Sequence, residues 1–546
     1  MKLLCFLLFL VLRFVAQAQF TFTTNDDNTI TITGYTGSDS SVMIPSAIEG
    51  LPVTSIGFDA FDSATSLTNI TISDGIQSLE DWSFAGCSGL TMISIPETVT
   101  NIGIGAFYIC TSLPNITIPN SVASIGGWAF NSCSSLTNFV IGSGTSIIGS
   151  QTFVGCSSLA AFTMADGNPY FSSDNGVLFG QNQKLLVAYP PGKTGNYTVP
   201  NSVTTIEEHA FAFCRNLTAV TIPGTVTNIQ DYTFYGSSLT SLTISNSSLN
   251  MGHWSFSDCY DLTNVALVDC PASIGDFAFN DCYALTEALL GTNCTGIGSS
   301  AFSFCHNLCS IIIPGSVTNI GGYAFNNCAR LTNAIILQGV SNISSNAFYR
   351  CFGLTSIMIP GSVTNVGNDA FDSCINLTNI MFSNGTTHIG KWAFYSCLGL
   401  VDVTLPSTLT DLGTGAFDSC TSLQKIFFCG NAPNYEIQHI YNQFPAVTIY
   451  YLPGATGWED TFAGRPTALW LPQMQTTDAD FGVQANQFGF NIKWASGQTV
   501  VVEASTDLSN FDWQSLQTNT LMTGSAYFSD PQWTNYPNRF YRIRSQ

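Results

Sequence analysis

Cysteine is the residue whose type and spacing point most directly to chemistry. Thirteen of the 18 cysteines stand three residues after a phenylalanine that recurs along the chain, and Ala64 and Ser237 take this position in two further copies. A zinc site needs ligands clustered at short spacing, which the sequence does not contain. Because Ala and Ser also fit, we interpret these cysteines as buried, reduced thiols that fill small apolar spaces. The better candidates for a disulfide lie outside the pattern, with no pairing indicated: Cys270, Cys294, Cys309 and Cys429.

Histidines and carboxylates give no catalytic arrangement. The five histidines occupy unrelated positions: His209, His253, His306, His388 and His439. The chain has no H-E-x-x-H, no G-x-S-x-G and no phosphate-binding loop. The densest titratable cluster, Glu207-Glu208-His209, is typical of a solvated turn, and the acidic stretch Asn25 to Asn28 lacks the spacing of a calcium loop. The sequence therefore predicts no catalytic residue, metal or cofactor, and a protein that is not an enzyme.

Charge and the N-terminus restrict the partners and the location. The chain has 35 Asp plus Glu against 14 Lys plus Arg, a formal net charge of -21, so a nucleic-acid partner is not expected. Lys2, an apolar run and the pattern Ala16-Gln17-Ala18 predict a signal peptide over 1–18, cleaved after Ala18. No later stretch has the length of a transmembrane helix. We expect a secreted or cell-surface protein.

The phenylalanine that precedes each cysteine marks a sequence repeat. Its spacing is 23 residues, except for one step of 22 and one of 58. The 15 copies are Phe61, Phe84, Phe107, Phe130, Phe153, Phe211, Phe234, Phe256, Phe279, Phe302, Phe325, Phe348, Phe371, Phe394 and Phe417. A fixed period of this length is typical of a repeat architecture in which neighbouring units share one core.

The repeat pattern I-G-x-x-A-F-x-x-C-x-x-L-T-x-I-x-I indicates the elements that position these residues. Its last residues alternate apolar and polar, as in a strand with one buried face. The spacing of Phe and Cys predicts one short helical turn. Stacked units place equivalent residues about 4.8 Å apart with parallel side chains, which does not suit disulfide geometry.

These residues resemble the BspA-like leucine-rich repeats, which implies a leucine-rich repeat solenoid of parallel β-strands and short helical turns. We predict an N-terminal cap over 19–60, repeats over 61–453 with a hairpin insertion at about 165–198, a linker over 454–472 and a small all-β module over 473–546. The insertion contains two apolar runs around the sequence GQNQK, which indicates a hairpin. Proteins of this family are typically secreted or surface adhesins, so the resemblance implies attachment to matrix proteins or to other cells.

Two rows of repeat positions are candidates for binding. Seven aromatic residues stand two before the repeat phenylalanine: Trp82, Trp128, Tyr232, Trp254, Phe277, Tyr323 and Trp392. Such rings could stack on sugars, but the interrupted row favours packing. The second row lies between the two buried residues of each strand, where alternation directs side chains outward. It is mostly Thr near the N-terminus and then apolar at Leu289, Ile312, Ile335, Met358, Met381, Phe427 and Tyr450.

The apolar part of the second row has three interpretations. The C-terminal module or a second copy covers it, a partner protein binds it, or strand propensity alone explains it. We expect a non-catalytic adhesin that binds a protein ligand, with extracellular matrix and another cell's surface as candidates. The alternatives are a self-associating surface-layer or matrix component and a polysaccharide-active enzyme. The enzyme would need paired carboxylates in the C-terminal module, whose acidic residues show no such pattern: Asp478, Asp480, Glu503, Asp507, Asp512 and Asp530.

Overall fold

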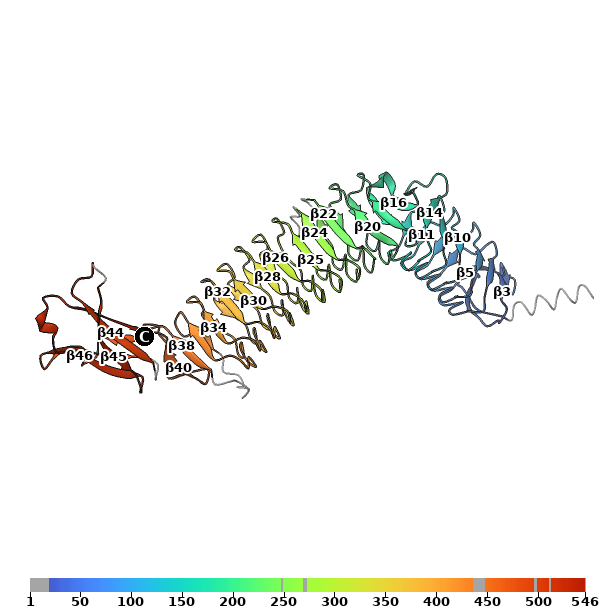
Figure 1. The fold of residues 1–546 in the computed structure, drawn as a ribbon. Coiled ribbons are helices and arrows are strands. Elements are labelled where there is room, and N and C mark those ends of the chain that lie inside the picture. Colours follow the sequence, from blue (N-terminus) through green and yellow to red (C-terminus); the bar gives the residue numbers. More distant parts are fainter. Residues whose placement is uncertain are drawn as a thin grey trace, which may run out of the picture. The chain divides into compact units, whose positions relative to one another are not determined.

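The computed structural model describes residues 19–246, 249–268, 273–435, 447–494, 498–509 and 512–545. The predicted signal peptide, Cys270 and His439 lie outside these residues. The chain divides into two compact units, the first ending at Ser310 and the second beginning at Ile311. We describe each unit by itself (Figure 1).

In the first unit, most repeats contribute one strand of their L-x-x-I-x-I segment to one of three parallel sheets, as the alternation predicts. In most of these strands the inward apolar residues are buried and the residues between them are not. Leu242 and Ile244 of β22 are buried, for example, whereas Ile93 of β8 is only half-buried. The strands are β3 (Ser41–Ile44), β6 (Asn69–Ile72), β8 (Met92–Ser94), β10 (Asn115–Thr117), β12 (Asn138–Ile141), β14 (Ala161–Met164), β18 (Gly195–Thr198), β20 (Leu217–Thr221), β22 (Ser241–Ser245), β24 (Asn264–Val268) and β25 (Glu287–Leu290).

A second set of parallel strands, two residues long in most repeats, was not expected from the sequence. It forms around the isoleucine of the I-G pair in the repeat pattern, with sequences such as N-I, S-I, T-I and N-M. Neighbouring repeats pair in register, as Asn101 and Ile102 do with Ser124 and Ile125. A two-residue strand is too short to give a visible alternation. These strands are β7 (Ser78–Leu79), β9 (Asn101–Ile102), β11 (Ser124–Ile125), β13 (Ile147–Ile148), β19 (Thr205–Ile206), β21 (Asn228–Ile229) and β23 (Asn250–Met251).

The N-terminal segment adds strands to the sheet of two-residue strands, at the edge before β7. β1 and β2 are antiparallel, and β2 then pairs in parallel with β5. The bounds are β1 (Phe20–Thr24), β2 (Ile30–Tyr35), β4 (Ala47–Ile48) and β5 (Leu51–Ile56). The predicted limits of the cap and of the other domains stay predictions.

The A-F-x-x-C segment forms hydrogen-bonded turns, and the predicted helical turn is wrong. Among the described residues the only helices are two three-residue 3-10 segments, η1 (Gln181–Gln183) and η2 (Trp533–Asn535), and neither lies in such a segment. The Ala85 N–H donates to Trp82 O at 2.9 Å, but Trp82 and Gly86 have φ values of 58° and 66°. Left-handed residues on both sides of the phenylalanine prevent a continuous helix, because a right-handed helix needs negative φ throughout.

The repeat phenylalanines form the centre of the core. Their rings stack from one repeat to the next, with centroids 5.4 Å apart for Phe84 and Phe107 and 5.1 Å apart for Phe107 and Phe130. Each of these three rings is fully buried. The 23-residue period thus places one ring on the next, and the stack holds the outward side chains at fixed spacing.

The 58-residue step contains an antiparallel hairpin. β15 (Phe171–Asp174) pairs with β16 (Val177–Gly180), and β16 pairs with β17 (Leu185–Ala188). β17 then pairs in parallel with β19, which re-enters the repeat register. The two-residue strands therefore stop at β13 and resume at β19.

The second unit continues the same architecture from β26. Its main strands are β26 (Ser310–Ile313), β28 (Asn333–Ile336), β30 (Ser356–Ile359), β32 (Asn379–Phe382), β34 (Asp402–Leu405), β36 (Lys425–Phe428) and β38 (Thr448–Tyr451), seen side by side in Figure 1. Its two-residue strands are β27 (Asn319–Ile320), β29 (Asn342–Ile343), β31 (Asn365–Val366), β33 (His388–Ile389), β35 (Asp411–Leu412) and β37 (Asn434–Tyr435). Within 454–472, the predicted linker, β40 (Arg465–Leu469) pairs with β38 and β39 (Thr461–Phe462), which extends the sheet.

The C-terminal residues form a small antiparallel module with its own core. One sheet contains β41 (Gln473–Gln475), β42 (Gly482–Gln484), β43 (Gln487–Lys493) and β46 (Ser525–Asp530), and the other contains β44 (Thr499–Ser505), β45 (Gln514–Thr520) and β47 (Phe540–Ser545). Phe490, Ile492 and Phe528 from the first sheet pack with Val500 and Val502 from the second. In the part of the chain that the structure describes, no helix has the length and hydrophobicity that a membrane crossing requires.

Candidate binding surface

Four consecutive strands of the second unit expose a large apolar residue. β26, β28 and β30 alternate exposed and buried residues, which directs one side chain outward between two in the core. The exposed fractions of the four residues, which we call the stripe, are 50% for Ile312, 40% for Ile335, 51% for Met358 and 44% for Met381. This confirms the predicted outward direction of these side chains, whereas their role in binding stays a prediction.

The register of the strands places the residues of the stripe side by side. Met358 pairs with Met381, and Ser356 pairs with Asn379 beside them. Ser356 and Asn379 are exposed, so a row of short polar side chains lies next to the apolar row. An apolar row with a polar border, on the order of a few hundred Å² in area, is the arrangement found at protein interaction sites.

The remaining members of the predicted row differ in their surroundings. Leu289 lies in β25 of the first unit, where it is 56% exposed and pairs with Ala266. Phe427 and Tyr450 are only half-buried side chains of β36 and β38 rather than exposed ones. The Phe427 ring lies 4.8 Å from that of Trp470 and 5.1 Å from that of Tyr450. The exposed stripe ends at Met381, because β34 has Thr404 at the paired position. Beyond it, Trp470 packs on Phe427.

The repeat cysteines are buried thiols with a specific hydrogen bond. In most repeats the Sγ donates to the carbonyl oxygen of the phenylalanine one repeat earlier, at 3.3 Å from Cys110 to Phe84 and 3.1 Å from Cys351 to Phe325, whereas the Cys214 Sγ lies 3.9 Å from Tyr189 O. Burial raises the pKa of the Cys87 thiol to about 12. Such thiols are neutral and unreactive at neutral pH, since the thiolate is the nucleophile and metal ligand. The sequence indicated a small filler but gave no sign of the hydrogen bond.

The cysteines outside the pattern also act as thiols where they are described. The Sγ of Cys294 lies 3.6 Å from Gly296 O, and that of Cys309 lies 3.2 Å from Asn307 O. Cys429 is partly exposed and carries a thiol. The expectation that these positions are the better candidates for a disulfide is not met among the described residues. The described residues contain no cluster of three metal-ligating side chains.

The aromatic row packs on itself in the first unit. The centroids of Tyr232 and Trp254 are 5.9 Å apart and those of Trp254 and Phe277 are 4.0 Å apart, with interplanar angles of 6° and 4°. His209 extends the row, since its ring lies 5.0 Å from Tyr232 at 4°. The faces between these rings are covered, which agrees with packing rather than with sugar stacking on each ring.

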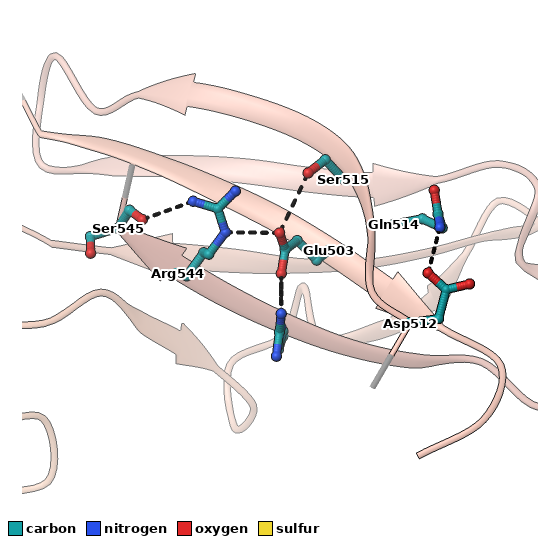
Figure 2. Close-up of polar contacts among 7 residues, drawn as sticks. Glu503, Asp512, Gln514, Ser515, Arg544 and Ser545 are labelled. Atoms are coloured by element: carbon teal, nitrogen blue, oxygen red, sulfur yellow. Dashed lines mark hydrogen bonds and ion pairs between the residues drawn. The ribbon is translucent and has the colours of Figure 1, made fainter. Parts of the chain in front are cut away.

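The carboxylates of the C-terminal module are held by cations and amides. The Arg544 Nε donates to Glu503 Oε1 at 2.8 Å, as Figure 2 shows, and the Arg542 Nε donates to Glu503 Oε2 at 2.8 Å. The Arg544 guanidinium holds the pKa of Glu503 below its ordinary value, and Arg542 adds to this. Asp478 and Asp480 both accept from the amide of Asn491. An ionised Glu503 is suited to holding β47 against β44 and not to donating a proton.

Stacked parallel strands, one per 23-residue unit, define the protein as a leucine-rich repeat β-solenoid. The family model described as BspA type leucine rich repeat region matches residues 52–175, 193–270, 229–353 and 341–451. The chain therefore belongs to the BspA-type leucine-rich repeat family, as its repeat motif predicts.

Solved structures of bacterial leucine-rich repeat proteins resemble the chain. A leucine-rich repeat protein from Bacteroides ovatus is 23% identical, with a TM-score of 0.46, and the match covers 75% of this chain and 93% of that one. A leucine rich cell surface protein from Faecalibacterium prausnitzii is 26% identical, with a TM-score of 0.37 and coverage of 67% and 93%. The pneumococcal vaccine antigen PcpA is 18% identical, with a TM-score of 0.33 and coverage of 80% and 92%. No curated protein matches the chain.

Proposed function

We propose that the chain is an exported, non-catalytic binding protein, an adhesin that contacts a partner protein through the stripe. The observation that supports this most is the run of four outward apolar side chains, Ile312, Ile335, Met358 and Met381, on consecutive strands of one sheet. The same repeat position carries Thr in most of the first unit, for example Thr221 and Thr243. Large apolar residues in place of Thr on an exposed face lower the solubility of the protein and add nothing to its core. Such a change is expected where a partner covers the face.

Export through the signal peptide over 1–18 and a location outside the cell are part of the proposal. The BspA-like resemblance implies both, and the matrix or the surface of another cell is then the source of the partner. A non-catalytic role fits the ionised, arginine-bound state of Glu503 and the absence of hydrolase motifs from the sequence. A structural layer component that self-associates is the second candidate, because the stripe of one copy could pack against that of another.

The test is a pair of charges placed in the stripe. Ile335→Asp combined with Met358→Asp puts two carboxylates on exposed strand positions, so the fold is retained and adhesion of the mature protein to matrix proteins or cells is lost. The matched control is Thr221→Asp combined with Thr243→Asp, at the same repeat position in the first unit. Circular dichroism and the thermal midpoint establish folding of both variants.

Three outcomes separate the candidates. Adhesion lost only in the stripe variant supports the adhesin. Adhesion retained by the folded stripe variant contradicts it. Sedimentation velocity over a range of concentrations tests the alternative, since self-association that the stripe variant abolishes supports a layer component instead.

A further inference from the structure

Three stacked rings lie at the surface of consecutive repeats of the first unit. They occupy the position after the repeat cysteine and are Tyr260, Tyr283 and His306, which we call the tyrosine row. The ring centroids are 5.4 Å apart for the two tyrosines and 5.2 Å apart for Tyr283 and His306, with interplanar angles of 21° and 10°. Both tyrosines are exposed and His306 is half-buried, so the row presents its ring edges and hydroxyl groups to solvent.

The repeat turn places a carboxylate beside each tyrosine. Asp258 and Asp281 stand two residues before Tyr260 and Tyr283, with left-handed φ values of 58° and 59°. The N–H of each tyrosine donates to the carbonyl oxygen of its aspartate at 2.9 Å, which closes a tight turn. Two copies of the same pair, an aspartate and a tyrosine, therefore lie in neighbouring repeats.

The effects of the carboxylates on neighbouring groups show how close they lie. A hydrogen bond to Asp258 is the main cause that raises the pKa of Tyr235, in the preceding repeat, and the charge of Asp281 is the main cause that raises the pKa of Tyr283. Burial and then the charge of Asp258 raise the pKa of Asp281. The two carboxylates thus repel each other, and a cation placed between them would relieve this repulsion.

The chain supplies little positive charge to this face. Among the described residues, no ion pair includes Asp258 or Asp281. His306 attracts Asp281 only when its ring is protonated. The nearest basic residues in the sequence are Arg215 and Arg330, and the stretch between them contains seven Asp and Glu and no Lys or Arg. Exposed rings and unneutralised carboxylates therefore occur together.

The first ring of the row has one open face. Ser238 takes the equivalent position one repeat earlier, and among the described residues only Tyr283 stacks on Tyr260. Tyr260 is accordingly 51% exposed, whereas Tyr283, with a ring on each side, is 42% exposed. A tyrosine face beside a carboxylate attracts a cation through both the ring and the charge. A guanidinium fits best, because it is planar, stacks on aromatic faces and pairs with carboxylates.

We propose that the tyrosine row and its two aspartates bind an arginine-containing segment of a partner protein. One guanidinium lies on the open face of Tyr260 and pairs with Asp258, and a second basic side chain pairs with Asp281. Residues i and i+2 of an extended segment suit this, since they face the same side about 7 Å apart. The charge of the face selects a basic partner. This site lies in the first unit, apart from the stripe, and does not depend on the proposed function.

The probe is the capped peptide GRGRG, compared with its lysine analogue GKGKG. Isothermal titration calorimetry with the full mature chain at low ionic strength is expected to show binding of both peptides, with the arginine peptide bound more tightly. Tyr260→Ser introduces the residue found at this position in the preceding repeat. It is expected to weaken binding of GRGRG about two- to fivefold and to reduce the preference for arginine over lysine.

The matched control for Tyr260→Ser is Tyr170→Ser. Tyr170 is 50% exposed, lies in the same unit and is outside the row, so its removal changes the exposed aromatic surface by a similar amount. Tyr170→Ser is expected to leave the binding of both peptides unchanged.

The carboxylates are tested by Asp258→Asn combined with Asp281→Asn. Asparagine also adopts a left-handed backbone readily, so the turns are retained, and binding of GRGRG is expected to weaken about fivefold. The matched control is Asp74→Asn combined with Asp166→Asn, which removes the same charge from two exposed positions of the same unit. Attraction of the peptide to the acidic chain as a whole would make the two pairs equal.

Four results overturn the proposal. The first is absence of binding at millimolar peptide. The second is equal weakening by the two asparagine pairs or by the two serine variants. The third is binding of arginine amide as tightly as GRGRG, which would indicate a site for a small cation. The fourth is binding of the neutral oligosaccharide maltoheptaose that Tyr260→Ser abolishes, which would indicate a sugar site.

Discussion

Phenylalanine and cysteine act together in most repeats. The stacked phenylalanine rings fill the core, and the thiol three residues later donates to the carbonyl of the preceding repeat's phenylalanine. The Phe107 carbonyl also accepts from the Cys110 N–H at 3.2 Å. The thiol therefore supplies a second hydrogen bond to this buried oxygen, which has two lone pairs, and contributes more than volume. Ser237 retains a hydroxyl at this position, 3.4 Å from the Sγ of Cys259. The regular cysteine spacing therefore reports the period of the core and not a redox or metal site.

The buried thiols make stability decrease at alkaline pH. Their folded pKa is raised, to about 12 for Cys87 and Cys133, whereas an unfolded thiol titrates near pH 8.5. The stabilisation is complete below about pH 8.5 and is lost as the pH rises from there toward the folded pKa, because only the unfolded chain releases protons. Guanidinium titrations at pH 7, 9 and 10 are expected to give a falling midpoint.

The reactivity of the thiols tests whether the repeat cysteines are buried and reduced. With a disulfide reagent at pH 8, the partly exposed Cys429 is expected to react in the native protein, whereas the buried repeat thiols react only after unfolding. Cys429→Ser then removes one rapidly reacting thiol. Rapid reaction of many thiols in the native state would contradict the burial.

At the scale of the element, consecutive residues of each strand lie in different environments, one in the core and the next at the surface. Ile357 is 1% exposed and its neighbour Met358 is 51% exposed in the same four-residue strand. The turn on the other side of the repeat is equally constrained, since left-handed residues flank the phenylalanine. Both features recur because the repeat length is 23 residues in most copies, so the backbone of each repeat follows the same course around the core.

Neighbouring aspartate substitutions test which face each strand buries. Ile357→Asp places a carboxylate in the core and is expected to cost about 3 to 5 kcal/mol, whereas Met358→Asp is expected to change the free energy of unfolding by less than about 1 kcal/mol. Denaturant titration of the two single variants measures the difference. Comparable losses would mean that the outward residue is not exposed.

At the scale of the whole chain, stability is distributed among regions that contact only their neighbours in sequence. The C-terminal module has a core of its own, and its two sheets are antiparallel where the repeats are parallel. The stripe lies on repeat strands and not in the module. A substitution in one region is therefore expected to leave the other regions intact.

Glu503→Gln tests this independence in the module. It removes the charge shared by Arg542 and Arg544 and is expected to destabilise the module by about 1 to 3 kcal/mol at pH 7. Because the folded pKa of Glu503 is lowered, its stabilisation is present above the ordinary value of 4.5 and is lost as the pH falls below it, so the two proteins converge in acid.

Hydrogen exchange at β44 and β47 measures the effect, with the repeat strands as an internal reference. The matched control is Asp512→Asn, since Asp512 is exposed and accepts only a short-range bond from Gln514 in Figure 2. Equal exchange in the Glu503 and Asp512 variants would show that the ion pairs do not stabilise the module.

The sequence by itself determined the repeat class, the family and the buried face of each main strand, because an exact period and a two-residue alternation are local properties of the chain. It also placed Ile312, Ile335, Met358 and Met381 on the outside. Only the tertiary structure decided that the A-F-x-x-C segment is a turn, that a second set of strands exists, and that Trp470 packs on Phe427. It alone revealed that β13 ends its sheet at the insertion and that β17 pairs with β16 and β19, because this depends on which strands pair. That pairing joins residues far apart in the sequence, where no local pattern records it.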